Sequence, residues 1–334
     1  MKTTPESLHV LITGGAGFVG SHLAEAELKS GNKVTAIDIR ISDKISHFKS
    51  EPRFQFIQAD SRDENALQSL IESADLIYHL GAIASPYVYI INPLEVLNTN
   101  IDSLRAVAKL CHAHKKKLVF SSSSEIYGNN PNVPWKETTF SAMSSPDKPR
   151  WCYAASKIIG EHYLFAYKRN GLKMTIGRFF NFYGPKLDNF SEKRSRVITA
   201  FLKDFFLNKP VTVVHPGDQV RCFTYISDAI DALREIAYNP AAEGEAFNIG
   251  NPEEITMLEL AQLIKRLGNF SSPITIIDAQ CFYGEGYDDI LKRIPDVNKI
   301  NTAVGWSAKV SLEEGLKKTI EYYTKQFQTG QLHI

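Results

Sequence analysis

Short apolar runs alternate with amphipathic segments through the first half of the chain. The apolar runs predict strands at residues 10–13, 34–38, 54–58, 76–79, 118–121 and 174–178. The segments between them predict helices around residues 21–29, 64–72, 93–114 and 153–170. Strands that alternate with helices indicate βαβ units and a parallel sheet. Because the strands are almost continuously apolar, we expect this sheet to be covered on both faces.

The pattern changes after about residue 180. Loops that carry Gly, Pro and Asn become longer, as at residues 184–190 and 284–289. Helical periodicity returns at residues 197–207, 228–238, 257–267 and 312–327. At 334 residues the chain has the length of about two domains or of one large α/β unit.

The charges of the chain nearly cancel. There are 38 Lys and Arg against 37 Asp and Glu, a net charge of +1, so charge gives no case for a nucleic-acid or anionic-membrane partner. No apolar run reaches the length of a signal peptide or a membrane span, which predicts a cytoplasmic protein. The cysteines are scattered and form no paired motif, so we expect reduced thiols and no metal site; they are Cys111, Cys152, Cys222 and Cys281.

A glycine-rich loop follows the first predicted strand. Gly14, Gly17 and Gly20 have the spacing GxxGxxG and stand between a strand and a helix, where the dinucleotide-binding fingerprint occurs. The three glycines allow a tight turn, a close approach of the backbone to a pyrophosphate, and close packing of the helix on the strand. The helix N-terminus then offers N–H groups to the phosphates. The predicted fold is therefore α/β, with a Rossmann-type doubly wound parallel sheet.

The second strand ends in Asp38, 24 residues after Gly14. A carboxylate there binds ribose hydroxyls and repels a 2′-phosphate, which favours NAD over NADP, although Arg40 is placed to accept such a phosphate. Asp60 follows the third strand, where it either reaches the adenine edge or caps a helix that starts at Ser61. The other predicted cofactor contacts are Phe18, Val19, Leu80 and Ala82.

Tyr153 and Lys157 stand four residues apart, on one face of a predicted helix. A phenol is a poor base at neutral pH, but a neighbouring ammonium favours the phenolate. Tyr153 could then take a proton from a substrate hydroxyl while that carbon is oxidised by a nicotinamide. Upstream, a strand ends in Ser123, Ser124 and Glu125, at the edge of a parallel sheet where ligands bind.

Together these motifs resemble the extended short-chain dehydrogenases/reductases that act on nucleotide sugars as epimerases and dehydratases. The resemblance covers nearly the whole chain and includes residues 178–185 and 221–228. Four stretches are most similar to UDP-glucuronate decarboxylases of the polymyxin-resistance type and to plant UDP-apiose/UDP-xylose synthases; they are residues 147–151, 184–189, 195–198 and 282–295.

The resemblance implies a role for each matching residue. Tyr153 and Lys157 would carry the redox step, Ser123 would be the catalytic hydroxyl with Ser124 beside it, and Glu125 would shape the site around a uronate carboxylate. Arg293 would donate a proton or clamp that carboxylate. The implied substrate contacts are Ser85 and Tyr89 at the sugar, and Asn181, Arg196, Arg221 and Tyr287 at the nucleotide end.

The serine run also separates activities within the family. Sugar 4,6-dehydratases carry an Asp where this chain has Ser124, and that Asp protonates the leaving hydroxyl. Epimerases of the family usually carry a small hydroxyl residue where this chain has Glu125. The resemblance therefore implies oxidation at C4 of UDP-glucuronate and loss of carbon dioxide. The alternatives are a uronate or hexose 4-epimerase, an apiose-type synthase, a dehydratase on another nucleotide sugar, and a non-catalytic NAD-binding protein.

The same resemblance implies an organisation for the chain. Residues 1–180, with about 222–250, would form the NAD-binding domain, and residues 181–221 and about 251–334 a smaller α/β domain for the nucleotide sugar. The helices at residues 93–114 and 153–170 match those that pair in homodimers of the family, so we expect a homodimer.

Overall fold

The computed structural model describes residues 7–188, 190, 196–278 and 290–332. The chain divides into two compact units, each built from several segments. The first unit comprises Met1–Ile126, Trp151–Arg178 and Leu233–Phe247; the second comprises Tyr127–Arg150, Phe179–Ala232 and Asn248–Ile334. The predicted division, with residues 1–180 and about 222–250 in the NAD-binding domain, stays a prediction; in the compact units, residues 127–150, 179–180, 222–232 and 248–250 belong to the second.

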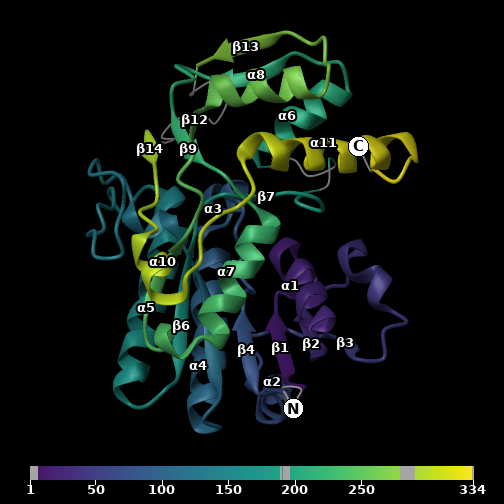
Figure 1. The fold of residues 1–334 in the computed structure, drawn as a ribbon. Coiled ribbons are helices and arrows are strands. Elements are labelled where there is room, and N and C mark those ends of the chain that lie inside the picture. The colour runs from purple at the N-terminus through teal and green to yellow at the C-terminus, as the bar shows by residue number, and fades with distance from the viewer. Residues whose placement is uncertain (1–6, 189, 191–195, 279–289, 333–334) are drawn as a thin grey trace. The chain divides into compact units, whose positions relative to one another are not determined.

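A seven-stranded sheet forms the centre of the first unit (Figure 1). Its strands lie in the order β11-β6-β5-β4-β1-β2-β3, and the pairs β1–β2, β1–β4, β2–β3 and β4–β5 are parallel. The bounds are β1 His9–Thr13, β2 Lys33–Asp38, β3 Phe54–Gln58, β4 Leu76–His79, β5 Lys117–Ser123, β6 Met174–Phe179 and β11 Ala246–Ile249. The order reverses between β1 and β4, where ligands bind in doubly wound sheets. The predicted parallel α/β fold is therefore confirmed.

Helices cover both faces of this sheet. Leu11 and Ile77 of the strands pack into one apolar cluster with α2, α4 and α5, whereas Tyr78, the next residue of β4, bonds to α1 on the opposite face. The helix bounds are α1 Phe18–Lys29, α2 Glu64–Ser73, α3 Pro86–Ile91, α4 Pro93–Ala113, α5 Cys152–Arg169 and α7 Ile226–Tyr238. Every predicted strand and helix of this region is confirmed within three residues at each end, and α3 was not predicted.

Local sequence explains where several helices begin. Asp63 caps α2, since its carboxylate accepts bonds from the backbone N–H groups of Asn65 and Ala66. Asn92 caps α4, which has Pro93 at its first position. The interpretation of Asp60 as the cap of a helix from Ser61 onward is therefore wrong, because the helix starts three residues later on its own aspartate.

The second unit contains short strands and four helices among its described residues. Its strands form a three-stranded sheet β12-β9-β14 and the pairs β10–β7 and β13–β8. The bounds are β7 Phe182–Tyr183, β8 Val211–Val214, β9 Val220–Cys222, β10 Thr224–Tyr225, β12 Glu254–Thr256, β13 Ile274–Ile277, β14 Lys292–Arg293, α6 Val197–Phe206, α8 Met257–Leu267, α10 Asn298–Val304 and α11 Leu312–Gln328. The predicted helices α6, α7, α8 and α11 are confirmed, while the strands and α10 were not predicted.

Within the described ranges, none of the helices combines the length and apolar character that crossing a bilayer requires. The same residues contain no group of three or more His, Cys, Asp or Glu side chains placed to hold a metal ion.

A buried carboxylate joins α7 to α1 in the first unit. Glu27 is fully buried and accepts hydrogen bonds from Tyr238 Oη and Asn32 Nδ2, both at 2.6 Å, and from Tyr78 Oη and Arg234 Nε, both at 3.2 Å. Four donors compensate the cost of removing this charge from water.

We expect Tyr238→Phe to lower the free energy of unfolding by about 1–2 kcal/mol, because it removes a bond to a buried charge. Urea denaturation followed by circular dichroism measures this loss. Tyr163→Phe is the matched control, since Tyr163 is exposed to a similar extent and makes no side-chain hydrogen bond to a described residue. Equal losses in the two variants would contradict the prediction.

Candidate active site

The glycine-rich loop packs backbone against backbone at the ends of β1 and β4. Gly14 has φ +68°, and a Cβ added there would lie 2.7 Å from the amide nitrogen of Gly81. A Cβ on Gly20 would collide with the carbonyl oxygen of Gly14, so the first turn of α1 must carry glycine to pack on the loop. Gly17 is the N-cap of α1, whose first residue is Phe18. Backbone N–H groups of such a first turn point out along the helix axis.

Asp38 closes the other side of this loop. Its Oδ2 accepts the N–H of Ala16 at 3.2 Å, and its Oδ1 accepts the N–H of Ile39 at 2.8 Å. Burial raises the pKa of the Asp38 carboxyl, and these backbone donors and the charge of Arg40 partly offset the effect. A carboxylate so held against the loop fits the ribose of an adenosine diphosphate, with the loop amides and α1 at the phosphates.

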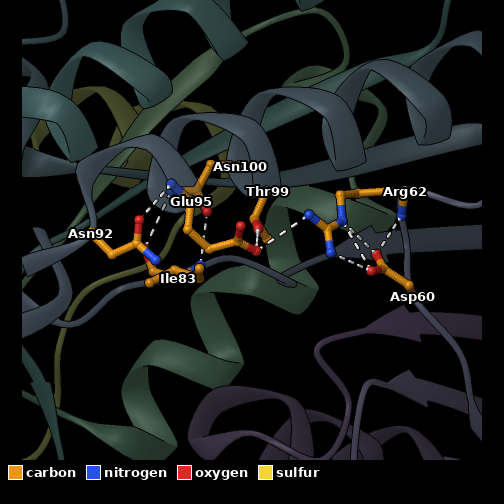
Figure 2. A network of polar contacts seen from close by, with 7 residues as sticks. All are labelled: Asp60, Arg62, Ile83, Asn92, Glu95, Thr99 and Asn100. Carbon is orange, nitrogen blue, oxygen red and sulfur yellow. Dashed lines mark hydrogen bonds and ion pairs between the residues drawn. The ribbon is translucent and has the colours of Figure 1, made fainter.

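Figure 2 shows that Asp60 belongs to a polar network between the β3–α2 loop and α4. Arg62 donates from Nη2 and Nε to the Asp60 carboxylate at 2.6 and 2.9 Å, and from Nη1 to Glu95 at 3.3 Å. The guanidinium of Arg62 lowers the pKa of Asp60. Asp60 is thus a fixed carboxylate at the end of β3, and its contact with adenine stays a prediction.

The remaining predicted cofactor residues follow the same strand ends. The Leu80 N–H donates to the carbonyl of Thr13, and the Gly81 N–H to its hydroxyl. Ala82 comes next in the chain, and Ser61 Oγ lies 3.5 Å from the position of a Cβ on Gly81. The carboxyl ends of β1, β3 and β4 therefore bring these segments together. Val19 lies in the first turn of α1.

Tyr153 and Lys157 lie on one face of α5, next to the end of β5. Lys157 Nζ is buried, donates to the carbonyl of Ser121 at 2.7 Å, and lies 5.7 Å from the centre of the Tyr153 ring. Burial lowers the pKa of Lys157 to about 7, although the charge of Glu161 opposes the shift. The Tyr153 ring stacks on Tyr89 of α3, with centroids 4.8 Å apart. Two residues predicted from separate motifs, at positions 89 and 153, are thus brought into contact.

The serine run ends β5 and turns into a 3-10 helix at Ser124–Tyr127. Ser123 Oγ accepts the backbone N–H of Glu125 at 3.2 Å. The Ser124 hydroxyl is buried and has no hydrogen-bond partner among the described residues. Burial raises the pKa of the Cys152 thiol, at the start of α5, to about 11, and the negative charge of Glu125 contributes a smaller part of the increase.

Sequence reasoning missed the side chains that hold this arrangement. Asn100 of α4 donates to Ser156 Oγ and bonds to both backbone groups of Ile83, and thereby joins α4 to α5 and to the β4–α3 segment. His79 Nδ1 lies 2.8 Å from Thr13 Oγ1, and burial lowers the pKa of the imidazole to about 3. A buried asparagine on the apolar face of a predicted helix was the available signal for Asn100.

Three predicted substrate residues lie together in the second unit. Asn181 has φ +41°, and its Nδ2 donates to the carbonyl of Cys222, next to Arg221. In the parallel pair β9–β14, Arg221 stands opposite Arg293. Residues opposite each other in a sheet project from the same face, so two cations lie side by side there.

The other predicted substrate residues lie elsewhere in the two units. Arg196 is the N-cap of α6 and pairs with the buried carboxylate of Asp188 at 3.3 Å. Ser85 precedes α3 as its N-cap. Tyr287 lies outside the described residues, as does most of the 282–295 stretch.

Comparison with known proteins gives the family. The profile described as the NAD dependent epimerase/dehydratase family matches residues 10–250. This chain belongs to the NAD-dependent epimerase/dehydratase family. Its cofactor is therefore NAD, which acts as a reversible hydride acceptor when bound. The loop around Gly14, the N-terminus of α1 and the Asp38 carboxylate fit this dinucleotide.

Two curated relatives cover nearly the whole chain. A UDP-N-acetyl-alpha-D-glucosaminuronate decarboxylase of Bacillus cytotoxicus is 35% identical over 94% of this chain and 97% of its own. The UDP-D-apiose/UDP-D-xylose synthase 1 of Arabidopsis thaliana is 34% identical over 96% of this chain and 92% of its own. The resemblance seen in the motifs is therefore confirmed.

A solved member of the family has the same fold. The UDP-glucuronic acid 4-epimerase of Bacillus cereus, in complex with UDP-glucuronic acid and NAD, has a TM-score of 0.85 and 26% identity. The alignment covers 95% of this chain and 99% of that one.

The lowered pKa of Lys157 predicts how the free energy of unfolding of the cofactor-free protein depends on pH. Its pKa is about 7 when folded and near 10.5 when unfolded, so between these values the unfolded chain binds an extra proton. Burial of the Lys157 ammonium therefore destabilises the folded protein fully below pH 7, and this cost declines as the pH rises toward 10.5. Relative to Lys157→Met, the wild type should gain about 2 kcal/mol between pH 7 and 9. Denaturation of both proteins across this range checks the difference, and parallel curves would contradict it.

Proposed function

We propose that the protein catalyses the NAD-dependent decarboxylation of UDP-glucuronate to a UDP-4-keto-pentose or UDP-pentose. The observation that carries this proposal is the pairing of Arg293 with Arg221 in one small sheet. Two guanidinium groups on one face of a sheet place two positive charges side by side, and arginine binds phosphate and carboxylate groups well. A UDP-uronate has two anionic groups, the diphosphate and the sugar carboxylate, and we assign Arg221 to the first and Arg293 to the second.

The names of the relatives support this reaction class. One relative decarboxylates a UDP-linked uronate, by its name, and the other makes UDP-xylose, a pentose. The first name also favours a second candidate substrate, the 2-acetamido counterpart of UDP-glucuronate. Both substrates carry the C6 carboxylate that the mechanism requires.

The chain's own residues would act in a fixed order. Tyr153 Oη, favoured as phenolate by the Lys157 ammonium, would take the proton of the sugar 4-hydroxyl, and NAD+ would be the acceptor of the hydride that C4 loses. The C4 ketone is β to the carboxylate, so the C5–C6 bond breaks, carbon dioxide leaves, and the electron pair forms an enolate. Hydroxyl donors at Tyr153 and Ser123 stabilise the enolate oxygen. Protonation of C5, for which Arg293 is a candidate donor, gives the 4-keto pentose.

A uronate 4-epimerase is the second candidate function, since the Bacillus cereus neighbour has that activity by its title. It shares the oxidation at C4 but keeps the carboxylate. Glu125 lies just after β5, at a position where the family resemblance implies a small hydroxyl residue in epimerases. The carboxylate at this position favours decarboxylation.

The deciding experiment uses UDP-glucuronate labelled at C6. Purified protein with NAD+ should release labelled carbon dioxide, and the 2-acetamido substrate run in parallel identifies the preferred sugar. Tyr153→Phe should lower turnover about 10²–10⁴-fold while NAD still binds. No release together with formation of UDP-galacturonate would overturn the decarboxylase and support the epimerase.

The two arginines should separate in binding measurements. Arg293→Gln should reduce affinity for UDP-glucuronate about 10-fold or more and leave affinity for UDP-glucose, which lacks the carboxylate, nearly unchanged. Arg221→Gln should weaken both ligands equally, since both carry the diphosphate. Titration calorimetry of the wild type and the two variants measures the dissociation constants of both ligands, and an equal loss of affinity for both ligands in Arg293→Gln would refute the carboxylate clamp.

A further inference from the structure

A buried ion pair lies behind the tyrosine and lysine of α5. Glu161 is 6% exposed, and its carboxylate binds Arg178 of β6 through Nε at 3.0 Å and Nη2 at 2.7 Å. Ser122 of β5 donates its hydroxyl to the same carboxylate at 2.6 Å. All three residues are buried in the first unit, so their bonds are shielded from solvent.

Glu161 and Lys157 attach one helix to one strand end. The two residues are four apart and therefore share a face of α5. Lys157 binds the carbonyl of Ser121, and Glu161 binds the hydroxyl of Ser122, the next residue of β5. Ser123 follows directly. The pair thereby fixes α5, with Tyr153 near its start, against the strand that carries the proposed catalytic hydroxyl.

The titratable groups around Lys157 come from its own helix and from neighbouring elements, and they differ in charge. Tyr153 and Glu161 face it from its own helix, and His79 faces it from β4 with an imidazole that is neutral, because burial lowers its pKa to about 3. Arg178 of β6 is bound to Glu161, and the residue that joins α4 to this face, Asn100, is uncharged. Glu161 is therefore the carboxylate whose charge favours the ammonium form of Lys157.

We propose that Glu161 is a positioning residue for the redox step: held by Arg178 and Ser122, its carboxylate keeps Lys157 charged beside Tyr153. This inference rests on the proposed roles of Tyr153 and Lys157 and adds the group that maintains them. Burial alone drives Lys157 toward its neutral form, in which it no longer favours the phenolate. The carboxylate opposes that tendency from one helical turn away.

The sign of the effect follows from this geometry. Turnover falls at high pH when Lys157 loses its proton. Without the negative charge of Glu161 the lysine loses that proton more easily, so the alkaline limb of the kcat–pH profile moves to lower pH. For a charge one helical turn away in a buried site, we expect a shift of about 1 pH unit.

Glu161→Gln tests the charge with little change of shape, since the amide oxygen can still accept bonds from Arg178 and Ser122. The kcat–pH profile, measured with whichever nucleotide sugar the wild type turns over, should shift downward in this variant. Glu161→Asp keeps the carboxylate, so the downward shift of its profile should be at most half of the shift in Glu161→Gln. Tyr163→Phe is an exposed, neutral change on the same helix and should leave the alkaline limb in place.

A second measurement needs neither substrate nor turnover. In the cofactor-free protein, the difference in unfolding free energy between Glu161→Gln and Glu161→Gln/Lys157→Met reports the pH at which the destabilising effect of buried Lys157 begins to decline. That onset should lie about 1 pH unit below the onset in the wild-type background. If Glu161→Gln alone does not fold, Glu161→Gln/Arg178→Met removes both partners of the ion pair, and its alkaline limb should also lie below that of the wild type.

The outcomes separate this inference from the proposed function. Full turnover in Tyr153→Phe would overturn the catalytic roles themselves. Loss of turnover in Tyr153→Phe, with an unmoved alkaline limb in Glu161→Gln, would overturn the inference alone. An equal shift in Glu161→Gln and Glu161→Asp would overturn it as well, because the effect would then come from altered packing and not from charge.

Discussion

The buried lysine of α5 is the constraint on which the catalytic end of the first unit depends. Lys157 crosses from its helix to the carbonyl of Ser121, so helix and strand end are held at one distance. Burying an ammonium is costly, which is why its pKa falls to about 7. The ion pair of Glu161 and Arg178 lies where it offsets this cost. A lysine whose burial destabilises the folded protein thus lies beside Tyr153, where strongly shifted pKa values are typical of functional sites.

The cofactor end of the same unit depends on close backbone contact. Gly14 and Gly20 leave no room for a Cβ, and the segment after β4 returns to Thr13 through two backbone N–H groups. The edge where β1 and β4 diverge therefore offers peptide groups and the Asp38 carboxylate to a ligand. The glycine-rich loop and the Tyr153–Lys157 pair lie at ends of strands in one sheet, because a parallel sheet directs all its carboxyl ends to one edge.

Two arginines stand opposite each other in the small sheet of the second unit. Arg221 and Arg293 face the same side of a small sheet, and Asn181 fixes the adjoining strand through the carbonyl of Cys222. A net charge of +1 conceals this pair entirely. The placement of two charges on one face depends on the pairing of the strands, which composition does not report.

The sequence by itself determined the periodic elements and the chemistry of the motifs. Strand β3, strand β4 and helix α8 have the predicted bounds, because apolar residues are concentrated in the two strands and recur at helical spacing along α8. The glycine spacing and the pairing of Tyr153 with Lys157 are local, so they too were legible along the chain. Strands of two or three residues, such as β7, β10 and β14, have no period and appear only when a partner strand supplies their hydrogen bonds.

Only the tertiary structure decided which side chains meet. Several contacts join positions whose spacing in the sequence does not imply them. They are the stacking of Tyr89 on Tyr153, the capping of α2 by Asp63 with Asp60 bound to Arg62, and the Glu161–Arg178 pair. Burial sets the protonation of Lys157 and His79, and burial exists only once the helices cover the sheet. Sequence therefore fixed what each element is, because propensity and periodicity act locally, and folding fixed the electrostatics, because charge interactions depend on distance and solvent exclusion.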